Sequence, residues 1–222
     1  HHYMVAARNE INSLKDLEGK RIAVSSPNSA PNIILELLFK AENLDWSSTQ
    51  QVSVGGSANR ARALIANQVD ATAFGVDEME NIEGDPNVKM LLLVKDVLPK
   101  YVGGGVIVNN DYIARPGVAE RLMEGMLKSV RFCFENQDAC VNLAADKGGK
   151  SRDGAAKTWE FFTKNQLWEP NGVITAEEID YMQQVNLDLQ TQDNKLPTEQ
   201  IIDMTHTEKV LGRIGRYTPK TS

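Results

Sequence analysis

The sequence is poor in the residues that most enzymes and metalloproteins use for their chemistry. It contains 2 cysteines and 3 histidines among 222 residues, and His206 has no other histidine or cysteine near it in the sequence. The motifs that mark serine hydrolases, phosphate-binding loops and zinc proteases are absent. We therefore expect no catalytic residue, no metal site and no cofactor.

Long apolar segments and an excess of positive charge are also lacking. No run of about 18 apolar residues occurs, so the sequence predicts no membrane-spanning helix, and it shows no signal peptide pattern. The net charge of −6 disfavours nucleic acids and anionic membranes as partners, because both repel a negatively charged protein. The apolar fraction of 41% and the charged fraction of 24% are ordinary for a globular protein.

The two cysteines, Cys133 and Cys140, are seven residues apart in the segment FCFENQDAC. On an unbroken helix this spacing corresponds to two turns, a rise of about 10 Å, which is too long for a disulfide. A break in the helix at residues 135–138 would bring the cysteines together. Three hypotheses stay open: two separate buried thiols, a disulfide across a helix–helix corner, and a reactive or metal-binding pair. Only the disulfide would indicate an oxidising compartment.

Residues 15–41 have the pattern of a strand, a polar loop and an amphipathic helix. Apolar residues 22–24 come before a turn of Ser, Asn and Pro, and apolar residues then recur at helical spacing. We predict that Ser29 caps this helix and that Pro31 lies in its first turn. A helix that begins in this way presents free N–H groups, which attract anions and hydrogen-bond acceptors.

The alternation of strand, loop and helix continues to residue 108 and predicts an α/β fold with a largely parallel sheet. In such sheets, ligands bind at the carboxyl ends of the strands, where loops lead into helices. The expected strands span 3–7, 21–25, 51–54, 71–74, 89–94 and 102–108.

Three of the loops that follow these strands are rich in serine, glycine and asparagine, which let a ligand approach the backbone closely. They span residues 25–31, 55–60 and 75–77. The residues predicted to bind a ligand are Ser26, Asn28, Ser29, Gly56, Ser57, Asn59, Arg60 and Asp77.

Each of these residues also has a structural interpretation. The polar residues of 25–31 suit an ordinary turn with a helix cap, Ser57 is predicted to cap the helix over 58–67, and Asp77 suits a cap of the helix after it. Arg60 falls in the first turn of a helix, where a cation opposes the helix dipole. One hypothesis is that it pairs with an anionic ligand group, and the alternative is an arginine that is solvated or paired with an acid. Asp70, just before a strand, is predicted to be structural.

From residue 109 onwards the patterns are helical. Thr175 and Glu178 fit a capping box. The apolar faces of this part exceed what one small sheet can cover, and the strand at 3–7 has no partner nearby in the sequence. The simplest explanation is that residues are missing before the N-terminus. The expected helices span 116–135, 138–145, 153–165, about 176–189 and 197–206.

The phrases DLEGKRIAV, ALIANQVDA and ENQDACVNLA, in this order, resemble phrases of the NMT1/THI5-like family of substrate-binding proteins. The family versions are of the type D-L-x-G-K, A-L-x-x-G-x-V-D-A and N-P-x-x-A. This chain departs from them at Asn67, where glycine is frequent, and at Gln137, where proline is usual. The resemblance covers roughly residues 10–200 and depends on the succession of phrases. Members of the family serve ABC importers, and relatives bind sulfonates, nitrate, pyrimidines, flavins or aromatic acids.

The resemblance implies a type II periplasmic-binding-protein fold, in which two α/β lobes close on a ligand. The chain would then hold one complete α/β lobe plus the C-terminal helices of the other lobe, as an N-terminally truncated member. By this interpretation residues 1–15 are the end of lobe one and the crossover, residues 16–108 are lobe two, and residues 109–222 are a helical part that packs on lobe one.

The implied function is that of the solute-binding component of an ABC importer. Such a protein captures a small polar or anionic organic ligand between its lobes and delivers it to an ABC permease in the membrane. We expect a periplasmic or otherwise extracytoplasmic monomer with no enzyme activity and no nucleic-acid partner. Two alternatives share the fold: a ligand-sensing domain like the effector domain of LysR-type regulators, and an enzyme like the fungal pyrimidine synthases. The sequence lacks the helix-turn-helix head of the first, and the cysteine-rich motif and histidines of the second.

Overall fold

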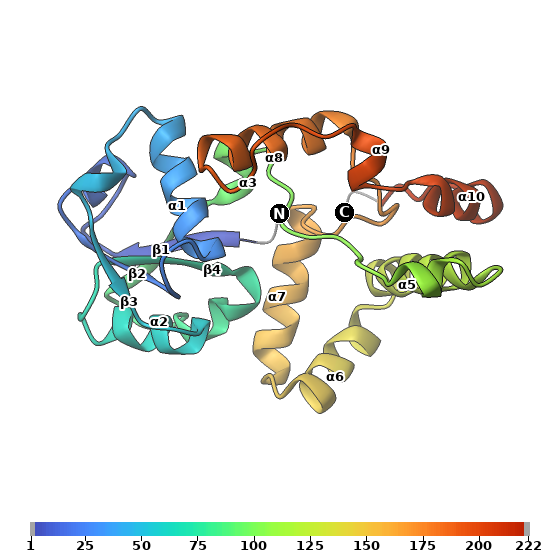
Figure 1. Ribbon diagram of the computed structural model, residues 1–222. Coiled ribbons are helices and arrows are strands. Elements are labelled where there is room, and N and C mark those ends of the chain that lie inside the picture. The colour runs from blue at the N-terminus through green and yellow to red at the C-terminus, as the bar shows by residue number, and fades with distance from the viewer. Residues whose placement is uncertain (1–2, 220–222) are drawn as a thin grey trace. The chain divides into compact units, whose positions relative to one another are not determined.

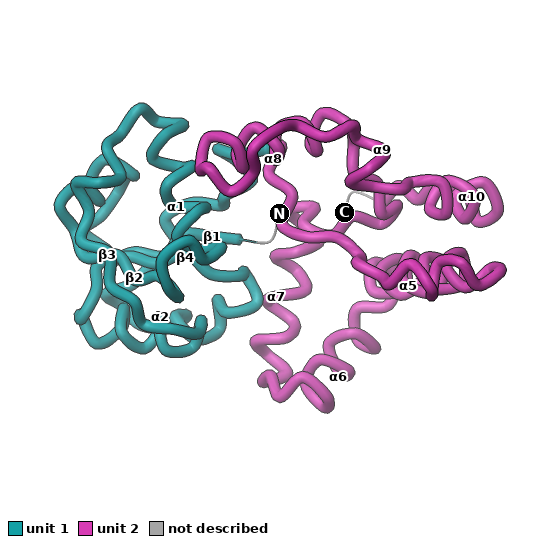
Figure 2. The backbone as a smooth tube through the Cα atoms, in the orientation of Figure 1, with its two compact units in different colours: residues 1–99 teal, residues 100–222 magenta. Residues whose placement is uncertain are grey.

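The computed structural model describes residues 3–219. The chain divides into two compact units, His1–Pro99 (unit 1) and Lys100–Ser222 (unit 2), which Figure 2 colours teal and magenta. Unit 1 contains a sheet with helices, whereas the described part of unit 2 is helical (Figure 1). None of the helices within residues 3–219 combines the length and the apolar character that crossing a membrane requires.

Unit 1 is built on a five-stranded mixed sheet. Its strands are β1 (Tyr3–Arg8), β2 (Arg21–Val24), β3 (Gln50–Ser53), β4 (Ala71–Gly75) and β5 (Val88–Leu93). They are hydrogen-bonded in the order β3-β2-β4-β1-β5. The strands β3, β2 and β4 are parallel, whereas β1 is antiparallel to both β4 and β5. The inner strands are buried on both faces, which explains why their sequences are almost continuously apolar.

The first strand has partners that the sequence did not indicate. β1 lies inside the sheet of unit 1, between β4 and β5. Residues 4–7 of this strand are fully buried there. Both partner strands come much later in the chain, so no local pattern marks the pairing.

Two helices cover opposite faces of this sheet (Figure 1). α1 (Ala30–Ala41) connects β2 to the edge strand β3, and α2 (Ser57–Ile65) connects β3 back to β4. These two crossovers run in opposite directions along the sheet, so right-handed connections place their helices on opposite faces. The remaining elements of unit 1 are η1 (Lys15–Leu17), η2 (Trp46–Ser48), η3 (Val76–Asn81) and α3 (Val94–Val97).

Unit 2 consists of helices and irregular segments in its described part. Its helices are α4 (Asn110–Ile113), α5 (Val118–Glu135), α6 (Gln137–Gly148), α7 (Arg152–Lys164), α8 (Ala176–Asp188), α9 (Thr198–Ile201) and α10 (Thr205–Ile214). α5 packs against α10 and buries Leu127 with Val210 and Leu211. The predicted capping box of α8 is confirmed, because Thr175 and Glu178 bond each other's backbone N–H groups.

Two predictions for unit 2 are wrong. Residues 102–108 were expected to form a strand, but they lie outside helices and strands, and Ile107 is 95% exposed. Three consecutive glycines disfavour a strand, and the described part of unit 2 offers no strand to pair with. The last helix was expected over 197–206, but α9 ends at Ile201 and α10 begins at Thr205. Residues 205–214 form a separate helix whose apolar face, with Val210 and Leu211, packs against Leu127 of α5.

The structure selects the disulfide among the three hypotheses for the cysteines. Cys133 and Cys140 are bonded through their sulfur atoms, with their Cα atoms 5.5 Å apart. The helical chain breaks at Asn136, between α5 and α6, within the range where a break would allow the bond. Trp159 of α7 donates a hydrogen bond from Nε1 to the carbonyl oxygen of Cys133 at 2.7 Å, so the bridged corner is also tied to α7.

Candidate functional site

The predicted ligand-binding residues come from three loops at one edge of the unit 1 sheet. Because β3, β2 and β4 are parallel, their carboxyl ends meet at the same edge. A hydrogen bond of 2.9 Å from the Val54 N–H to the Val24 carbonyl joins the ends of β3 and β2. We call this region, formed by the loops after the three strands, the carboxyl edge.

In the loop after β2, the side chains of Ser29 and Asn32 form hydrogen bonds within the loop and to β3. Ser29 occupies the N-cap position of α1, as predicted, but its hydroxyl donates to the Ser26 carbonyl at 2.7 Å and does not cap the helix. Asn28 has a φ of 58°, which asparagine tolerates better than most residues, and its N–H donates to Asn32 Oδ1 at 3.2 Å. Asn32 is buried and donates to Gln51 Oε1 at 2.9 Å. Ser26 and Asn28 stay exposed.

In the loop after β3, the predicted cap is wrong by one residue. Gly56, rather than Ser57, is the N-cap of α2, because Ser57 is already helical. The preceding Gly55 has a φ of 88°, which glycine adopts without strain. The hydroxyl of Ser57 accepts a hydrogen bond from Arg60 at 3.3 Å, and the side-chain oxygen of Asn59 accepts one from Arg62.

Arg60 connects the ends of all three parallel strands. It is only 3% exposed, although the sequence suggested a residue at the surface. Its five N–H groups donate to five neutral oxygens: Thr72 Oγ1 at 3.2 Å, Ser25 Oγ, the Gly55 carbonyl, Ser57 Oγ at 3.3 Å and the Ala73 carbonyl at 3.2 Å. The predicted alternatives of a solvated or an acid-paired arginine are therefore both wrong.

The charge of Arg60 has no direct counter-charge among these five partners. Burial lowers the pKa of Arg60 from its ordinary value, while Tyr3 and the Glu78 carboxylate act in the opposite direction. Arginine nevertheless stays protonated in proteins. The carboxyl edge thus holds a buried positive charge next to the N-terminus of α2, whose dipole has the same sign. Both attract an anion.

In the loop after β4, Asp77 does not cap a helix as we predicted. β4 continues through Gly75, which is the N-cap of η3, so Asp77 falls within the first turn of that element. Its side chain is exposed. A carboxylate in a first turn is favourable toward the helix dipole, but it repels an anion. Asp77 is therefore the one predicted residue whose charge opposes the rest of the carboxyl edge.

Sequence analysis missed Ser25 and Thr72, which both bond Arg60. Ser25 was assigned to the end of a strand and Thr72 to the interior of another. A weak signal was present, because Thr72 is the one polar residue in the strand sequence ATAFG. A buried hydroxyl in an apolar strand needs a polar partner, and here that partner is the arginine.

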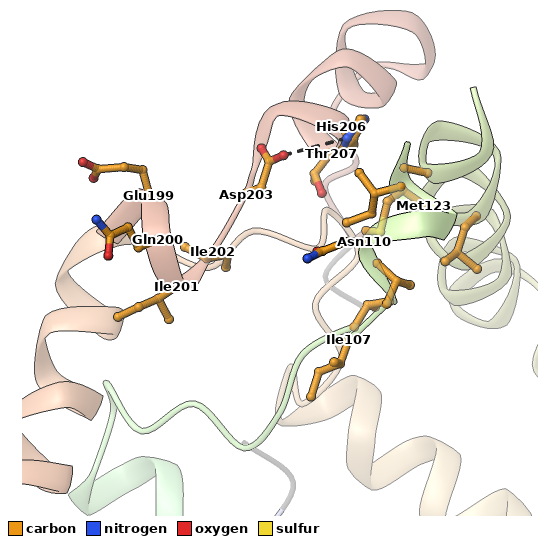
Figure 3. Close-up of a pocket in the computed structure, with 15 residues that line it drawn as sticks. Ile107, Asn110, Met123, Glu199, Gln200, Ile201, Ile202, Asp203, His206 and Thr207 are labelled. Carbon is orange, nitrogen blue, oxygen red and sulfur yellow. Dashed lines mark ion pairs between the residues drawn. The ribbon is translucent and has the colours of Figure 1, made fainter. Parts of the chain in front are cut away.

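A second candidate site lies within unit 2, where Figure 3 shows a pocket of about 340 Å³. Its wall is polar and apolar in about equal parts and comes from α4, α5, α9, α10, residues 106–108 and the connection at residues 202–203. His206 lies at one side, with Nδ1 at 3.0 Å from Glu120 Oε1 and Nε2 at 3.8 Å from Asp203 Oδ2. The hydrogen bond to His206 holds the pKa of Glu120 below its ordinary value. His206 therefore has a carboxylate near each of its ring nitrogens, whereas Arg60 bonds only neutral oxygens.

Neither region holds a cluster suited to a metal ion. Within residues 3–219, no three side chains of the types His, Cys, Asp or Glu gather closely enough to bind one. Both cysteines are in the disulfide, so they provide no thiol. The chemical groups at the carboxyl edge are hydroxyls, amides, backbone N–H groups, one guanidinium and the carboxylate of Asp77, which suit binding by hydrogen bonds and charge.

Comparison with known proteins gives a family and a fold. The model of the family described as NMT1/THI5 like matches residues 1–140, which is more than half of the chain. No curated protein matches the sequence.

Solved structures resemble nearly the whole chain at low sequence identity. A periplasmic sulfonate-binding protein from Methylobacillus flagellatus KT matches with a TM-score of 0.71 and 17% identity, over 99% of this chain and 69% of that one. A zinc-bound ligand-binding component of an ABC-type import system from Staphylococcus aureus matches with a TM-score of 0.73 and 13% identity, over 94% and 70% of the two chains. The periplasmic aliphatic sulphonate binding protein from Escherichia coli gives 0.69 and 14%, over 100% and 67%.

These likenesses confirm the predicted periplasmic-binding-protein fold. This chain corresponds to part of each relative, since the alignments cover 67–70% of their lengths. The assignment of residues 1–15, 16–108 and 109–222 to particular lobes stays a prediction.

Proposed function

The chain belongs to the NMT1/THI5-like family, and from this we propose that it acts as the solute-binding component of an ABC importer. It captures a small, anionic or polar organic ligand between two lobes and presents the closed form to a membrane permease. Closure of this kind is a hinge motion that the ligand stabilises by contacting both lobes. The relation to ABC-transporter solute-binding proteins through family and fold supports the proposal.

The observation that carries the proposal is the positive charge of Arg60 at the carboxyl edge. A buried charge that bonds only neutral groups is costly, and although the Glu78 carboxylate acts on it favourably, it still attracts an anion that comes from outside the protein. Two of the loops that bond Arg60 also carry the other predicted residues, which are exposed or half-buried: Ser26, Asn28, Ser29, Gly56, Ser57 and Asn59. Asp77, of opposite charge, contacts a hydroxyl or an amine of the ligand in this proposal.

The proposal is one of binding without turnover, outside the cytoplasm. The carboxyl edge has no histidine or free thiol among its described residues to act as base or nucleophile, which disfavours an enzyme like the pyrimidine synthases. The disulfide favours an oxidising compartment, and two of the similar proteins are periplasmic by name. A monomer that binds no nucleic acid fits this role.

A thermal-shift screen tests the proposal. The compounds are sulfonates, nitrate, aromatic acids, pyrimidines and flavins, each anion with a neutral analogue of similar shape. A ligand at 100 times its Kd stabilises the folded state by about 2.7 kcal/mol, which corresponds to a rise in Tm of roughly 5–10 °C for a chain of this size. We expect at least one anion to produce such a rise and its neutral analogue to produce less.

The same samples separate binding from catalysis. The ligand is incubated with the protein and then analysed by mass spectrometry, and we expect to recover it unchanged. Conversion of the ligand would favour the enzyme alternative. A screen in which no compound raises the Tm would overturn the proposed function.

A further inference from the structure

We propose that Arg60 is a positioning residue, which fixes the hydroxyls of Ser25 and Ser57 as hydrogen-bond donors toward the ligand. The subsite that results takes a head group that is anionic and carries only acceptor atoms, such as a sulfonate, a nitrate or a carboxylate. This inference rests on the proposed function, and it adds a role for Arg60 and Ser25 together with a class of head group.

The argument starts from the direction of the hydrogen bonds. A guanidinium has five N–H donors and no acceptor, so every oxygen that it contacts must accept. The hydroxyls of Ser25 and Ser57 both accept from the Nη atoms of Arg60. A serine oxygen that accepts in this way directs its own O–H group elsewhere. Both serines are half-buried, so a ligand can reach these O–H groups.

The other hydroxyls of the carboxyl edge show that this arrangement is selective. Thr72 also accepts from Arg60, but it is fully buried and its own O–H donates to the Ala23 carbonyl at 2.9 Å. The hydroxyl of Ser29 donates to the Ser26 carbonyl. Thr72 therefore anchors the guanidinium, whereas Ser25 and Ser57 keep an O–H group for the ligand.

The donors define the head group that fits. Two hydroxyls bond the buried, positively charged Arg60, and the N–H groups of Ser57 and Ala58 in the first turn of α2 have no partner within the helix. A head group made only of acceptors and bearing a negative charge satisfies all of them. An amine or an amide N–H of a ligand would face the donors of the protein, and both sets of donors would lack an acceptor. The site should therefore bind such ligands weakly. All five N–H groups of Arg60 are used within the protein, so Arg60 acts through its charge and through the two serines.

The first test uses three small probes of nearly equal shape on the full chain. Methanesulfonate is anionic and has three acceptor oxygens and no donor. Dimethyl sulfone is neutral and keeps two such oxygens, and methanesulfonamide keeps two and carries N–H donors. NMR titration of backbone amides measures even millimolar affinities and locates the site. We expect methanesulfonate to bind about tenfold or more tightly than dimethyl sulfone, and methanesulfonamide to bind no better than the sulfone. The shifted amides should lie in residues 25–29 and 55–60.

The second test asks whether Arg60 works through the serines. R60K keeps the charge but offers three N–H donors on one nitrogen in place of five in a planar fork, so it cannot hold all five oxygens, including the two hydroxyls, in their present places. We expect R60K to weaken methanesulfonate binding about threefold to tenfold in the wild-type background. In the S25A/S57A background, which already lacks both hydroxyls, the same change should have little further effect. The control is R62K, at an exposed arginine of the same helix, which should leave the affinity unchanged.

The outcomes separate this inference from the proposed function. A purely structural role for Arg60 would give losses that add in the two backgrounds, and that result would overturn the inference. Methanesulfonamide or the sulfone binding as tightly as methanesulfonate would overturn the anionic head group. If methanesulfonate, nitrate and acetate all fail to bind while another compound of the screen does, the inference fails and the importer function stands. If no compound binds at all, both fail.

Discussion

An arginine lies at each end of the parallel strands of unit 1, and the two arginines differ in their hydrogen-bond partners. At the amino ends, Arg21 at the start of β2 bonds the carboxylate of Asp70, with Nη2–Oδ1 at 2.7 Å and Nε–Oδ2 at 3.1 Å. At the carboxyl ends, Arg60 bonds five neutral oxygens and no carboxylate. The more exposed arginine has the acid partner, and the more buried one has none.

This difference indicates which end of the sheet is built for stability and which for a ligand. An arginine with a bidentate carboxylate is a complete structural unit. A buried arginine bonded only to neutral groups retains an electrostatic cost, which the Glu78 carboxylate reduces and which an anion from outside the protein would reduce further. Folded proteins keep such unfavourable arrangements mainly at functional sites, and the carboxyl edge is where α/β sheets bind their ligands.

Removing the carboxyl-end arginine is expected to have the largest effect on stability. R60M would leave several buried oxygens without a donor, each at a cost of about 1–3 kcal/mol. We therefore expect unit 1 to lose about 3 kcal/mol or more in its free energy of unfolding. Hydrogen exchange of the amides of β2 and β4 in increasing urea measures this for unit 1 alone.

The matched control for R60M is R62M, at an exposed arginine of the same helix. It should change the free energy of unfolding by no more than about 0.5 kcal/mol. If R60M is as stable as R62M, the five oxygens find other partners, and the contrast between the two ends of the sheet loses its energetic basis.

The contrast between the two ends was only half predictable from the sequence. Asp70 was predicted to be structural, and its bonds to Arg21 confirm this. For Arg60 the sequence offered a solvated, an acid-paired or a ligand-paired side chain, because the first turn of a helix has the same local pattern in each case. Its burial depends on Ser25 and Ala73, which lie on other strands, and on neutral acceptors that no periodicity marks.

For the fold as well, two features set by neighbouring residues were predicted correctly, whereas a feature set by residues far apart in the sequence was not. The helix cap at Thr175 and the break near Asn136 depend on a few neighbouring residues, and both were found from the sequence. The place of β1 between β4 and β5 depends on pairing across most of unit 1, and it was not found. The strand expected over 102–108 does not form, because its three glycines disfavour a strand and the described part of unit 2 has no strand with which its apolar residues could pair.

A smaller effect is expected at Thr72, the fully buried anchor of Arg60. T72V keeps the shape but removes the acceptor for Arg60 Nε and the donor for the Ala23 carbonyl. With two buried groups left partly unpaired, we expect a loss of about 2 kcal/mol. The control T72S keeps both hydrogen bonds and loses one methyl group, so its loss should be about 1 kcal/mol. Equal losses in T72V and T72S would mean that packing of the methyl, and not the hydroxyl, is what Thr72 contributes.

The smallest effect is expected at the amino ends, where D70N tests the neutralised arginine. The hydrogen bond from Arg21 holds the pKa of Asp70 below its ordinary value. A carboxylate with a lowered pKa contributes stability above its unfolded-state pKa of about 4, and the contribution is lost as the pH falls through the lower folded-state value. D70N should therefore be less stable than the wild type at neutral pH, by less than T72V, and the two proteins should converge as the pH is lowered toward about 2. Urea unfolding at a series of pH values measures the difference. A difference that stays constant into the acid range would show that the Asp70 charge does not stabilise this end, and the two arginines would then differ only in burial.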